Sequence, residues 1–272
     1  MAQNIILIET STALCSVALA ENGQITAYRE SSAPKAHASL TAVFIQEMLD
    51  ERGLTLADCD AVCVSKGPGS YTGLRVGVST AKGLCFGSKK PLLAVGTLDT
   101  LVAQALSHPE LSEVIDFVAE ANAKESPYRF IIPMIDARRM EVYAAVFSTC
   151  NSESACHPES TCHPESTCHP ERSEGSPSYR QITETAPAII DETSFAEYLE
   201  QGPCLFIGDG AGKCADVIKH PNAHFCQCHP NAKAMLSPAM AVLNAKRFED
   251  VAYFEPFYLK EFVATVSKKK LF

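Results

Sequence analysis

The sequence predicts an α/β protein built from two similar halves, each with the element order βββαβαβα. Short apolar runs of strand length, helical segments between them, and the same order of elements in both halves support this prediction. Residue identity does not repeat between the halves, so the prediction of two similar halves rests on the order of elements alone. A chain of 272 residues, 46% of them apolar, is long enough to form two lobes with a core each.

The first half is expected to open with three antiparallel strands, because Glu21-Asn22-Gly23 is a hairpin turn signal. A helix follows and ends at Gly53, and two further strands each lead into a helix. The expected strands are 4–9, 15–20, 25–29, 61–64 and 91–95, and the expected helices are 34–51, one that follows a glycine-rich loop and ends near 88, and 97–106.

The second half is expected to repeat this order, so we divide the chain into an N-terminal lobe, residues 1–106, and a C-terminal lobe, residues 107–272. The expected strands are 130–135, 141–147, 179–185, 204–207 and 224–226, and the expected helices are 191–200, 211–219 and a C-terminal helix at 237–248.

Residues 149–178 do not follow the pattern, because they contain a six-residue repeat, CHPEST, with almost no apolar content. We expect a disordered insertion, since a long polar loop closes at a small extra entropic cost. Metal binding by the Cys-His pairs is the alternative, but a proline after every histidine matches no compact zinc module. The cluster of His224, Cys226, Cys228 and His229 is also interpreted as chance, because ligands so close cannot all face one tetrahedral ion.

Composition argues against two classes of protein. The net charge is −9, and Lys268, Lys269 and Lys270 form the one basic cluster, so a chain that grips nucleic acid by itself is not expected. No apolar run reaches the roughly 18 residues that cross a bilayer, and no basic segment precedes the first strand. We therefore expect a cytoplasmic protein that does not contact a membrane and whose cysteines are free thiols.

The loop that begins with Gly67 has the sequence GPGSYTGLRVG, which superficially suggests a phosphate-binding loop. Both phosphate templates fail, because Thr72 and Leu74 stand where a second glycine is needed. In the helix that follows, Gly73, Gly77, Thr80 and Leu84 fall on one stripe. Each helical glycine costs about 1 kcal/mol relative to alanine, so we expect the close approach of another backbone at this stripe.

The helix before this loop is apolar over a wide arc rather than a single stripe. A surface helix needs only a stripe of about 100° to bury one face, so this arc predicts two buried sides. Together the two helices predict a docking surface for a partner of similar shape, and Gly77→Leu is expected to leave the monomer folded but to abolish binding. The expected partner-binding residues are Leu40, Phe44, Ile45, Met48, Gly73, Gly77, Thr80 and Leu84.

Four stretches resemble the TsaB (YeaZ) family of tRNA threonylcarbamoyladenosine biosynthesis proteins: IETSTALCSVAL, GPGSYTGLRVGVSTAKGL, IDARRMEVYAAVF and YFEPFYLKEFVAT. The resemblance covers the chain apart from roughly residues 149–178. It implies two ribonuclease-H-like lobes of the actin/Hsp70-like (ASKHA) superfamily.

The resemblance also implies a role as a non-catalytic partner of TsaD, the related subunit that transfers threonylcarbamoyl to an adenosine beside the tRNA anticodon. It implies a TsaE-like ATPase as a third member of the complex, a homodimer formed through the N-terminal helices, and only indirect contact with tRNA.

The resemblance further implies that the catalytic features of related proteins are degraded here. TsaD-like members hold a metal with His-x-x-x-His, whereas this chain has His37 followed by Thr41, so no metal is expected. Kinase-like members have a glycine in the turn after the first strand, which residues 9–12 lack. Gly208, Gly210 and Gly212 of GDGAGK could meet an anion at a helix start, but they are weak candidates.

We therefore expect no catalytic residue and no cofactor. One alternative is an independent ATP-dependent small-molecule kinase or ATPase of the same fold, which would need an intact phosphate turn. A second is a metal-dependent, glycoprotease-like hydrolase, which would need the missing metal pair.

Overall fold

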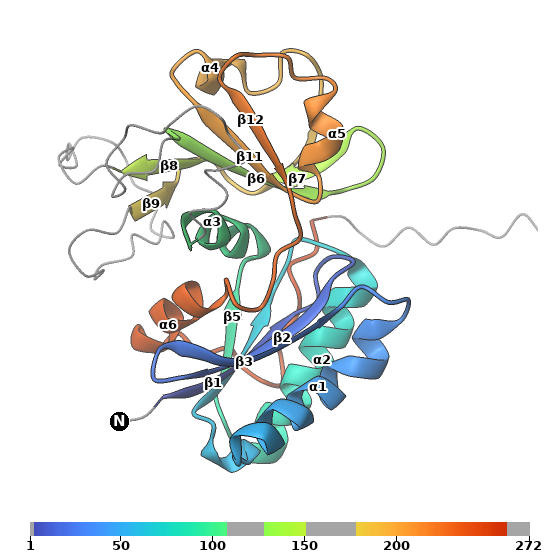
Figure 1. Cartoon of the computed structure of the whole chain (residues 1–272), viewed down its shortest axis with the longest axis vertical. Helices are drawn as coiled ribbons and strands as arrows, with labels where there is room; N and C mark the ends of the chain where they lie inside the picture. Colours follow the sequence, from blue (N-terminus) through green and yellow to red (C-terminus); the bar gives the residue numbers. More distant parts are fainter. Residues whose placement is uncertain (1–2, 108–127, 151–177, 260–272) are drawn as a thin grey trace, which may run out of the picture.

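The computed structural model describes residues 3–107, 128–150 and 178–259, which form two sheets stacked along the long axis of the molecule (Figure 1). The N-terminal sheet has the strand order β3-β2-β1-β4-β5. Its first three strands are antiparallel, and β4 and β5 run parallel to β1. The strands are β1 (Asn4–Glu9), β2 (Cys15–Glu21), β3 (Gln24–Ser31), β4 (Ala61–Ser65) and β5 (Leu92–Val95).

The C-terminal sheet repeats this arrangement, with the order β10-β7-β6-β11-β12. Strands β10, β7 and β6 are antiparallel, and β11 and β12 run parallel to β6. The doubled α/β architecture predicted from the element order is therefore confirmed. The strands are β6 (Phe130–Asp136), β7 (Glu141–Ala144), β8 (Phe147–Cys150), β9 (Ser178–Gln181), β10 (Ala186–Ile189), β11 (Cys204–Gly208) and β12 (Ala223–Gln227).

Two predicted strands of this second sheet are each interrupted. The strand predicted at 141–147 is β7 followed by β8, and the one predicted at 179–185 is β9 followed later by β10. At the break, the Val146 amide donates to Thr183 Oγ1 at 2.8 Å, and the Val146 carbonyl accepts from the Ile182 amide at 2.8 Å. These two hydrogen bonds join the neighbouring segments across the break. The CHPEST repeat between β8 and β9 lies outside the described residues.

The helices differ in length between the two lobes. In the N-terminal half, α1 (Ala36–Arg52) and α2 (Tyr71–Ser88) lie side by side on one face of the sheet, with a 3-10 turn at Leu56–Asp58 between them in sequence (Figure 1). The corresponding helices α4 (Ala196–Leu199) and α5 (Ala211–Ala215) are only four and five residues long, shorter than predicted. Among the described residues, none of the helices has both the length and the apolar character needed to cross a membrane.

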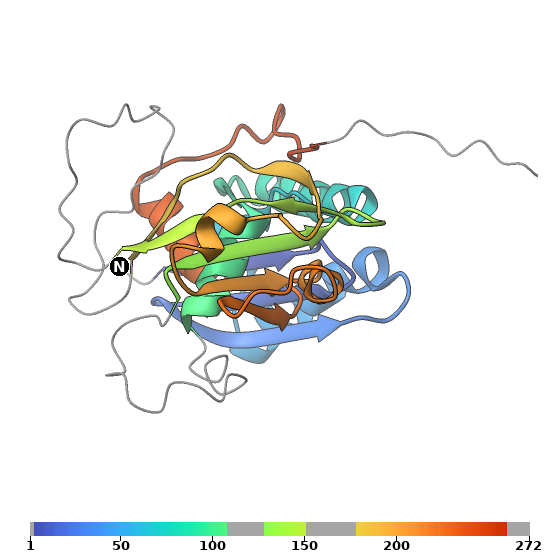
Figure 2. The ribbon, with the colours of Figure 1, turned by 90° about the horizontal axis from the view of Figure 1, so that it is seen from above.

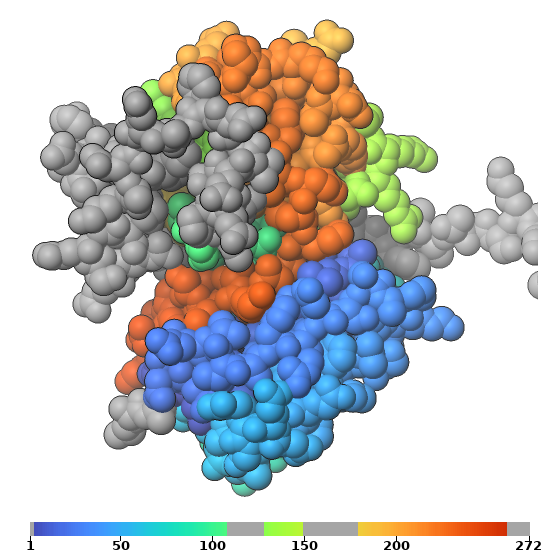
Figure 3. Space-filling view, in the orientation of Figure 1, coloured from blue at the N-terminus to red at the C-terminus, as the bar shows by residue number. Residues whose placement is uncertain are grey.

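The last helix of each half packs on the sheet of the other half. Helix α3 (Thr97–Ser107) places Leu101 and Val102 against β6 and β11 of the C-terminal sheet. Helix α6 (Leu236–Asn244) places Ala239 in one cluster with Ile5 and Leu7 of the N-terminal sheet. Figure 3 shows these C-terminal residues beside the blue N-terminal lobe. The predicted division at residue 106 therefore does not match the packing, because element order does not reveal which sheet a helix covers.

Residues 249–257, here called the C-terminal strap, also belong to the N-terminal lobe. The predicted helix 237–248 ends at Asn244, because the chain turns through a left-handed Lys246 with φ 52°. The Glu249 amide then donates to the Leu92 carbonyl at 2.9 Å, and the Phe257 amide to the Lys66 carbonyl at 2.7 Å. The strap thus closes the β5 edge of the sheet. Seen from above, the C-terminal sheet covers the N-terminal one, and the strap runs along one side (Figure 2).

Candidate docking surface

The glycines of α2 allow this helix to pack closely on its own chain. Gly73 and Gly77 are buried, and a Cβ atom on Gly73 would lie 2.1 Å from the backbone oxygen of Thr10. A Cβ atom on Gly77 would lie 2.2 Å from Thr10 Oγ1, the atom that donates to the Gly73 carbonyl at 2.9 Å. The backbone predicted to approach this stripe is therefore that of Thr10, in the turn directly after β1. Gly73 and Gly77 are not open to a partner, and Gly77→Leu is not compatible with the packing of the monomer.

The loop before α2 is likewise occupied by its own chain. A Cβ atom on Gly69 would lie 2.3 Å from the Ser11 carbonyl oxygen, which accepts from the Ser70 amide at 2.6 Å. A Cβ atom on Gly67 would lie 2.9 Å from the Phe257 carbonyl oxygen of the strap. The amide of Gly73 is capped by Ser70 Oγ at 3.4 Å. The loop therefore packs between the turn after β1 and the strap, and its Ser70 and Gly73 amides already donate within the chain.

The turn after β1, residues 9–12, is buried. Glu9 is fully buried, its Oε1 accepts from the Ser11 amide at 2.7 Å, and burial raises the pKa of its carboxyl. His37 contacts the backbone oxygen of Thr12 through Nε2 at 2.9 Å, and Thr41 Oγ1 donates to the His37 carbonyl at 2.6 Å. The turn at residues 9–12, considered as a phosphate site, and the His37–Thr41 pair, considered as a metal site, thus contact each other. Within the described ranges, no group of three or more His, Cys, Asp or Glu side chains could hold a metal ion.

The glycines of GDGAGK are also explained by packing. A Cβ atom on Gly208, which has φ +132°, would lie 2.1 Å from the Met134 carbonyl oxygen, and one on Gly210 would lie 2.9 Å from Val142 Cγ1. The amides of Gly210 and Gly212 donate to the Met134 carbonyl at 3.2 Å and to Gln227 Oε1 at 2.6 Å. The weak anion-binding prediction for Gly208, Gly210 and Gly212 is therefore not supported, because these amides already have partners.

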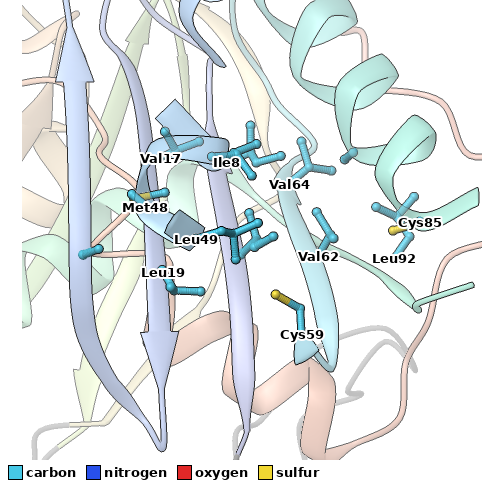
Figure 4. Packing of buried hydrophobic residues seen from close by; sticks show 14 of the residues in the cluster. Ile8, Val17, Leu19, Met48, Leu49, Cys59, Val62, Val64, Cys85 and Leu92 are labelled. Atoms are coloured by element: carbon cyan, nitrogen blue, oxygen red, sulfur yellow. The ribbon is translucent and has the colours of Figure 1, made fainter. Parts of the chain in front are cut away.

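On α1, half of the predicted partner-binding residues belong to the core. Ile45 is 3% exposed and Met48 is 1% exposed. Figure 4 shows Met48 and Leu49 directed at the strands of the N-terminal sheet. Leu40 and Phe44 are half-buried. Phe44 packs beside the same core cluster, so the apolar arc of α1 is in part a broad contact with its own sheet.

Several of the exposed residues on the two helices are apolar or small, among charged and polar neighbours. Val43 is 46% exposed on α1, and Phe86 is 82% exposed on α2. Gly83 and Gly87 are exposed, and a Cβ atom on either would contact nothing. We call this set the α1–α2 face; it consists of Val43, Gly83, Phe86 and Gly87. Thr80 and Leu84 are half-buried on the glycine stripe of α2, and Leu84 packs beside the core cluster, so neither belongs to this face.

Sequence reasoning missed Phe86, although a signal was present. Arg75, Ser79 and Phe86 fall on one stripe of α2, on the side opposite Gly73 and Gly77. All three are exposed. An aromatic residue on a stripe that is otherwise polar indicates an exposed contact point rather than core.

Two ribonuclease-H-like sheets of the same strand order, joined in one chain, define a two-lobed α/β protein of the actin/Hsp70-like (ASKHA) superfamily. A family model described as TsaD: tRNA N6-adenosine threonylcarbamoyltransferase matches residues 29–268. The chain therefore belongs to this family, and within it to the TsaB (YeaZ) proteins that it resembles in sequence.

The curated relatives are named tRNA threonylcarbamoyladenosine biosynthesis protein TsaB. The one from Escherichia coli strain K12 is 32% identical over 143 residues, which is 53% of this chain and 54% of the relative. The one from Haemophilus influenzae is 38% identical over 143 residues, which is 52% of this chain and 53% of the relative. The chain thus spans about half the length of these relatives in the matched region.

Solved structures agree with the fold over almost the whole chain. A Pseudomonas aeruginosa protein described as similar to peptidase YeaZ superposes with a TM-score of 0.71, covering 95% of this chain and 100% of that one at 22% identity. The structure named YeaZ from the same organism gives a TM-score of 0.70 at 22% identity, over 94% of this chain and 100% of that one. At this identity the likeness shows the fold.

Proposed function

We propose that this chain is a non-catalytic accessory subunit in tRNA threonylcarbamoyladenosine (t6A) biosynthesis, where it binds and activates a TsaD-like catalytic subunit. The α1–α2 face carries the proposal. Two long helices lie side by side on the outside of the N-terminal lobe and expose Val43 and Phe86. We take t6A biosynthesis as the pathway because the relatives are named for it.

The occupant we propose for this face is the like-shaped N-terminal helix pair of the TsaD-like subunit. Exposed glycines let a facing helix approach closely, and an aromatic residue beside them supplies an anchor. A homodimer through the same face is the competing arrangement, because one helix pair cannot contact two partners at once. A TsaE-like ATPase would join this pair, in the cytoplasm, where tRNA is modified.

Two features support a non-catalytic role. The amides of Ser70 and Gly73 at the start of α2, and those of Gly210 and Gly212 in GDGAGK, donate inside the chain. This weighs against a kinase or ATPase that needs them for phosphate. The net charge of −9 favours contact with tRNA through a partner rather than through this subunit. A metal-dependent hydrolase is disfavoured, because Thr41 replaces the second histidine of the metal pair.

The test compares Phe86→Glu with Ile189→Glu. Ile189 is 78% exposed on β10 of the C-terminal lobe, so it is a matched apolar control away from the α1–α2 face. Affinity for the TsaD-like protein of the same organism is measured by titration calorimetry, and tRNA modification is assayed with the reconstituted proteins. Phe86→Glu should weaken binding at least tenfold, about 1.4 kcal/mol, and reduce modification in parallel. The control should bind normally.

Equal affinity of both variants for the TsaD-like protein would place the contact elsewhere. Normal affinity combined with a lost homodimer would assign the face to self-association instead. ATP turnover by this chain alone would favour the kinase or ATPase alternative.

A further inference from the structure

Two cysteines at the end of β12 are more accessible than six others in the described part of the chain. Cys226 and Cys228 are half-buried, whereas the others are buried: Cys15, Cys59, Cys63, Cys85, Cys204 and Cys214. Because they are two residues apart in an extended segment, their side chains lie on the same side of the strand. Both pack beside the same apolar cluster, under α3. This places two partly accessible thiols next to each other.

The two thiols also differ in their acidity. A hydrogen bond from the Cys228 thiol to the Cys226 sulfur lowers the pKa of Cys226, and the same contact raises the pKa of Cys228. Burial raises the pKa of Cys204 to about 12 and that of Cys214 to about 11. Since the thiolate is the nucleophilic form, Cys226 is better suited to react than Cys204, Cys214 or Cys228.

We propose that Cys226 and Cys228 form a peroxide-reactive thiol pair, in which Cys226 is the reacting residue and Cys228 closes the intramolecular disulfide. The co-reactant is hydrogen peroxide. The Cys226 thiolate attacks one peroxide oxygen and the O–O bond breaks, which gives a sulfenic acid and a hydroxide that takes up a proton to become water. Cys228 then attacks the Cys226 sulfur and loses its proton. The S–S bond forms, the S–O bond breaks, and a second water leaves.

Closing this disulfide would pull on the residue between the two cysteines. Cα atoms two positions apart in a strand are about 6.7 Å apart, at the upper end of the roughly 4.4–6.8 Å that a disulfide tolerates. The chain must therefore bend at Gln227. Its side chain accepts from the Gly212 amide at 2.6 Å and donates to the Asp209 carbonyl at 3.0 Å. Oxidation should release these two hydrogen bonds and loosen the start of α5.

The pair also lies where the chain leaves one lobe for the other. The His229 carbonyl accepts from Gln104 Nε2 of α3 at 3.3 Å, and the Ala232 amide donates to Ser16 Oγ of β2 at 3.0 Å. The segment that connects the two lobes is therefore held at His229 and Ala232 and is not a free loop. A bend at Gln227 should move the first residues of this segment.

Tryptic mapping of the full chain tests the proposal. Trypsin releases residues 220–233, HPNAHFCQCHPNAK, which contain both cysteines and no other, and residues 214–219, which contain Cys214 alone. After treatment with hydrogen peroxide, the first peptide should lose the mass of two hydrogen atoms. This should happen at least about tenfold faster than any oxidation of Cys214, because the thiolate is the reacting form. Dithiothreitol should restore the reduced mass.

Two variants assign the roles. Cys228→Ser should leave a sulfenic acid at Cys226 that dimedone traps, whereas Cys226→Ser should give neither adduct nor disulfide in residues 220–233. The proposal is overturned if residues 220–233 stay reduced, if Cys214 oxidises as fast, or if dimedone labels Cys226→Ser instead. In the oxidised chain, the Gly212 amide should exchange its hydrogen faster. Unchanged exchange would refute the coupling to α5.

Discussion

The turns after the first strands of the two sheets occupy the same place in the fold but have opposite environments. The N-terminal turn, residues 9–12, is buried under α2. The C-terminal turn, residues 136–139, is mostly exposed and charged. Lys213 of α5 holds it, through the Asp136 carboxylate and the carbonyl oxygens of Arg139 at 2.8 Å and Glu141 at 2.6 Å.

The difference between the turns follows from the helix that packs on each. Helix α2 has 18 residues, and its glycines bring it into contact with the N-terminal turn. Helix α5 has only five residues and reaches the C-terminal turn through one lysine. The same sheet topology thus yields one lobe with a tightly packed turn beneath a long outer helix, and one with an open turn. The long helices, and the surface they expose, belong to the first.

The largest predicted effect tests the packing of the N-terminal turn. Gly73→Ala places a Cβ atom 2.1 Å from the Thr10 carbonyl oxygen, a backbone atom that cannot move without disturbing the turn. We expect the free energy of unfolding to fall by about 4 kcal/mol, above the usual 1–3 kcal/mol for overpacking. Equilibrium urea unfolding measures this.

Gly83→Ala is the matched control on the same helix, because a Cβ atom there contacts nothing. It should raise the free energy of unfolding by about 0.5–1 kcal/mol through helix propensity. If both substitutions changed stability equally, close packing of α2 on the turn would not explain its glycines.

A second prediction concerns α6, the helix that follows the C-terminal strands in sequence but packs on the N-terminal sheet. Met235 precedes α6 directly and is completely buried against the N-terminal sheet. Met235→Ala should lower the free energy of unfolding by about 3 kcal/mol, through lost burial and the cavity left behind. Hydrogen exchange should accelerate in β1 and β5 more than in β11. Met240→Ala, at a half-buried position of the same helix, should cost less. Faster exchange confined to β11 would contradict the assignment of α6 to the N-terminal lobe.

The smallest predicted effect comes from the buried carboxyl of the N-terminal turn. Burial raises the pKa of Glu9 above 4.5, so above this pH the folded chain keeps a proton that the unfolded chain has released. The free energy of unfolding should therefore decrease as the pH rises from about 4.5 towards the folded pKa. Glu9→Gln cannot ionise and should remove this slope. Urea unfolding of both proteins across this pH range measures it, and parallel profiles would show that Glu9 does not contribute.

The element order and the doubled sheet could be predicted, because the strands are short apolar runs and Asn22 and Gly23 adopt the left-handed conformations that a tight hairpin requires. The packing of α3 and α6, each on the sheet of the other lobe, could not be predicted. Both helices are apolar on the side they bury, and periodicity does not identify the sheet that covers that side.

The docking surface was predicted only in outline, for a related reason. A glycine stripe shows that something approaches closely, but not that it is Thr10 of the same chain. A wide apolar arc on α1 does not separate the buried Ile45 and Met48 from the exposed Val43. Telling them apart requires the position of the neighbouring sheet, which the local sequence does not contain.

The placement of α6 on the first strand has a consequence for synthesis on the ribosome. Leu7 is made roughly 230 residues before Met235, which shares its cluster. At about 5–20 residues per second, this face of the nascent N-terminal sheet is left uncovered for roughly 10–45 seconds. During translation it is therefore a natural binding site for a chaperone, and the N-terminal lobe, although begun before the C-terminal sheet, is completed after it.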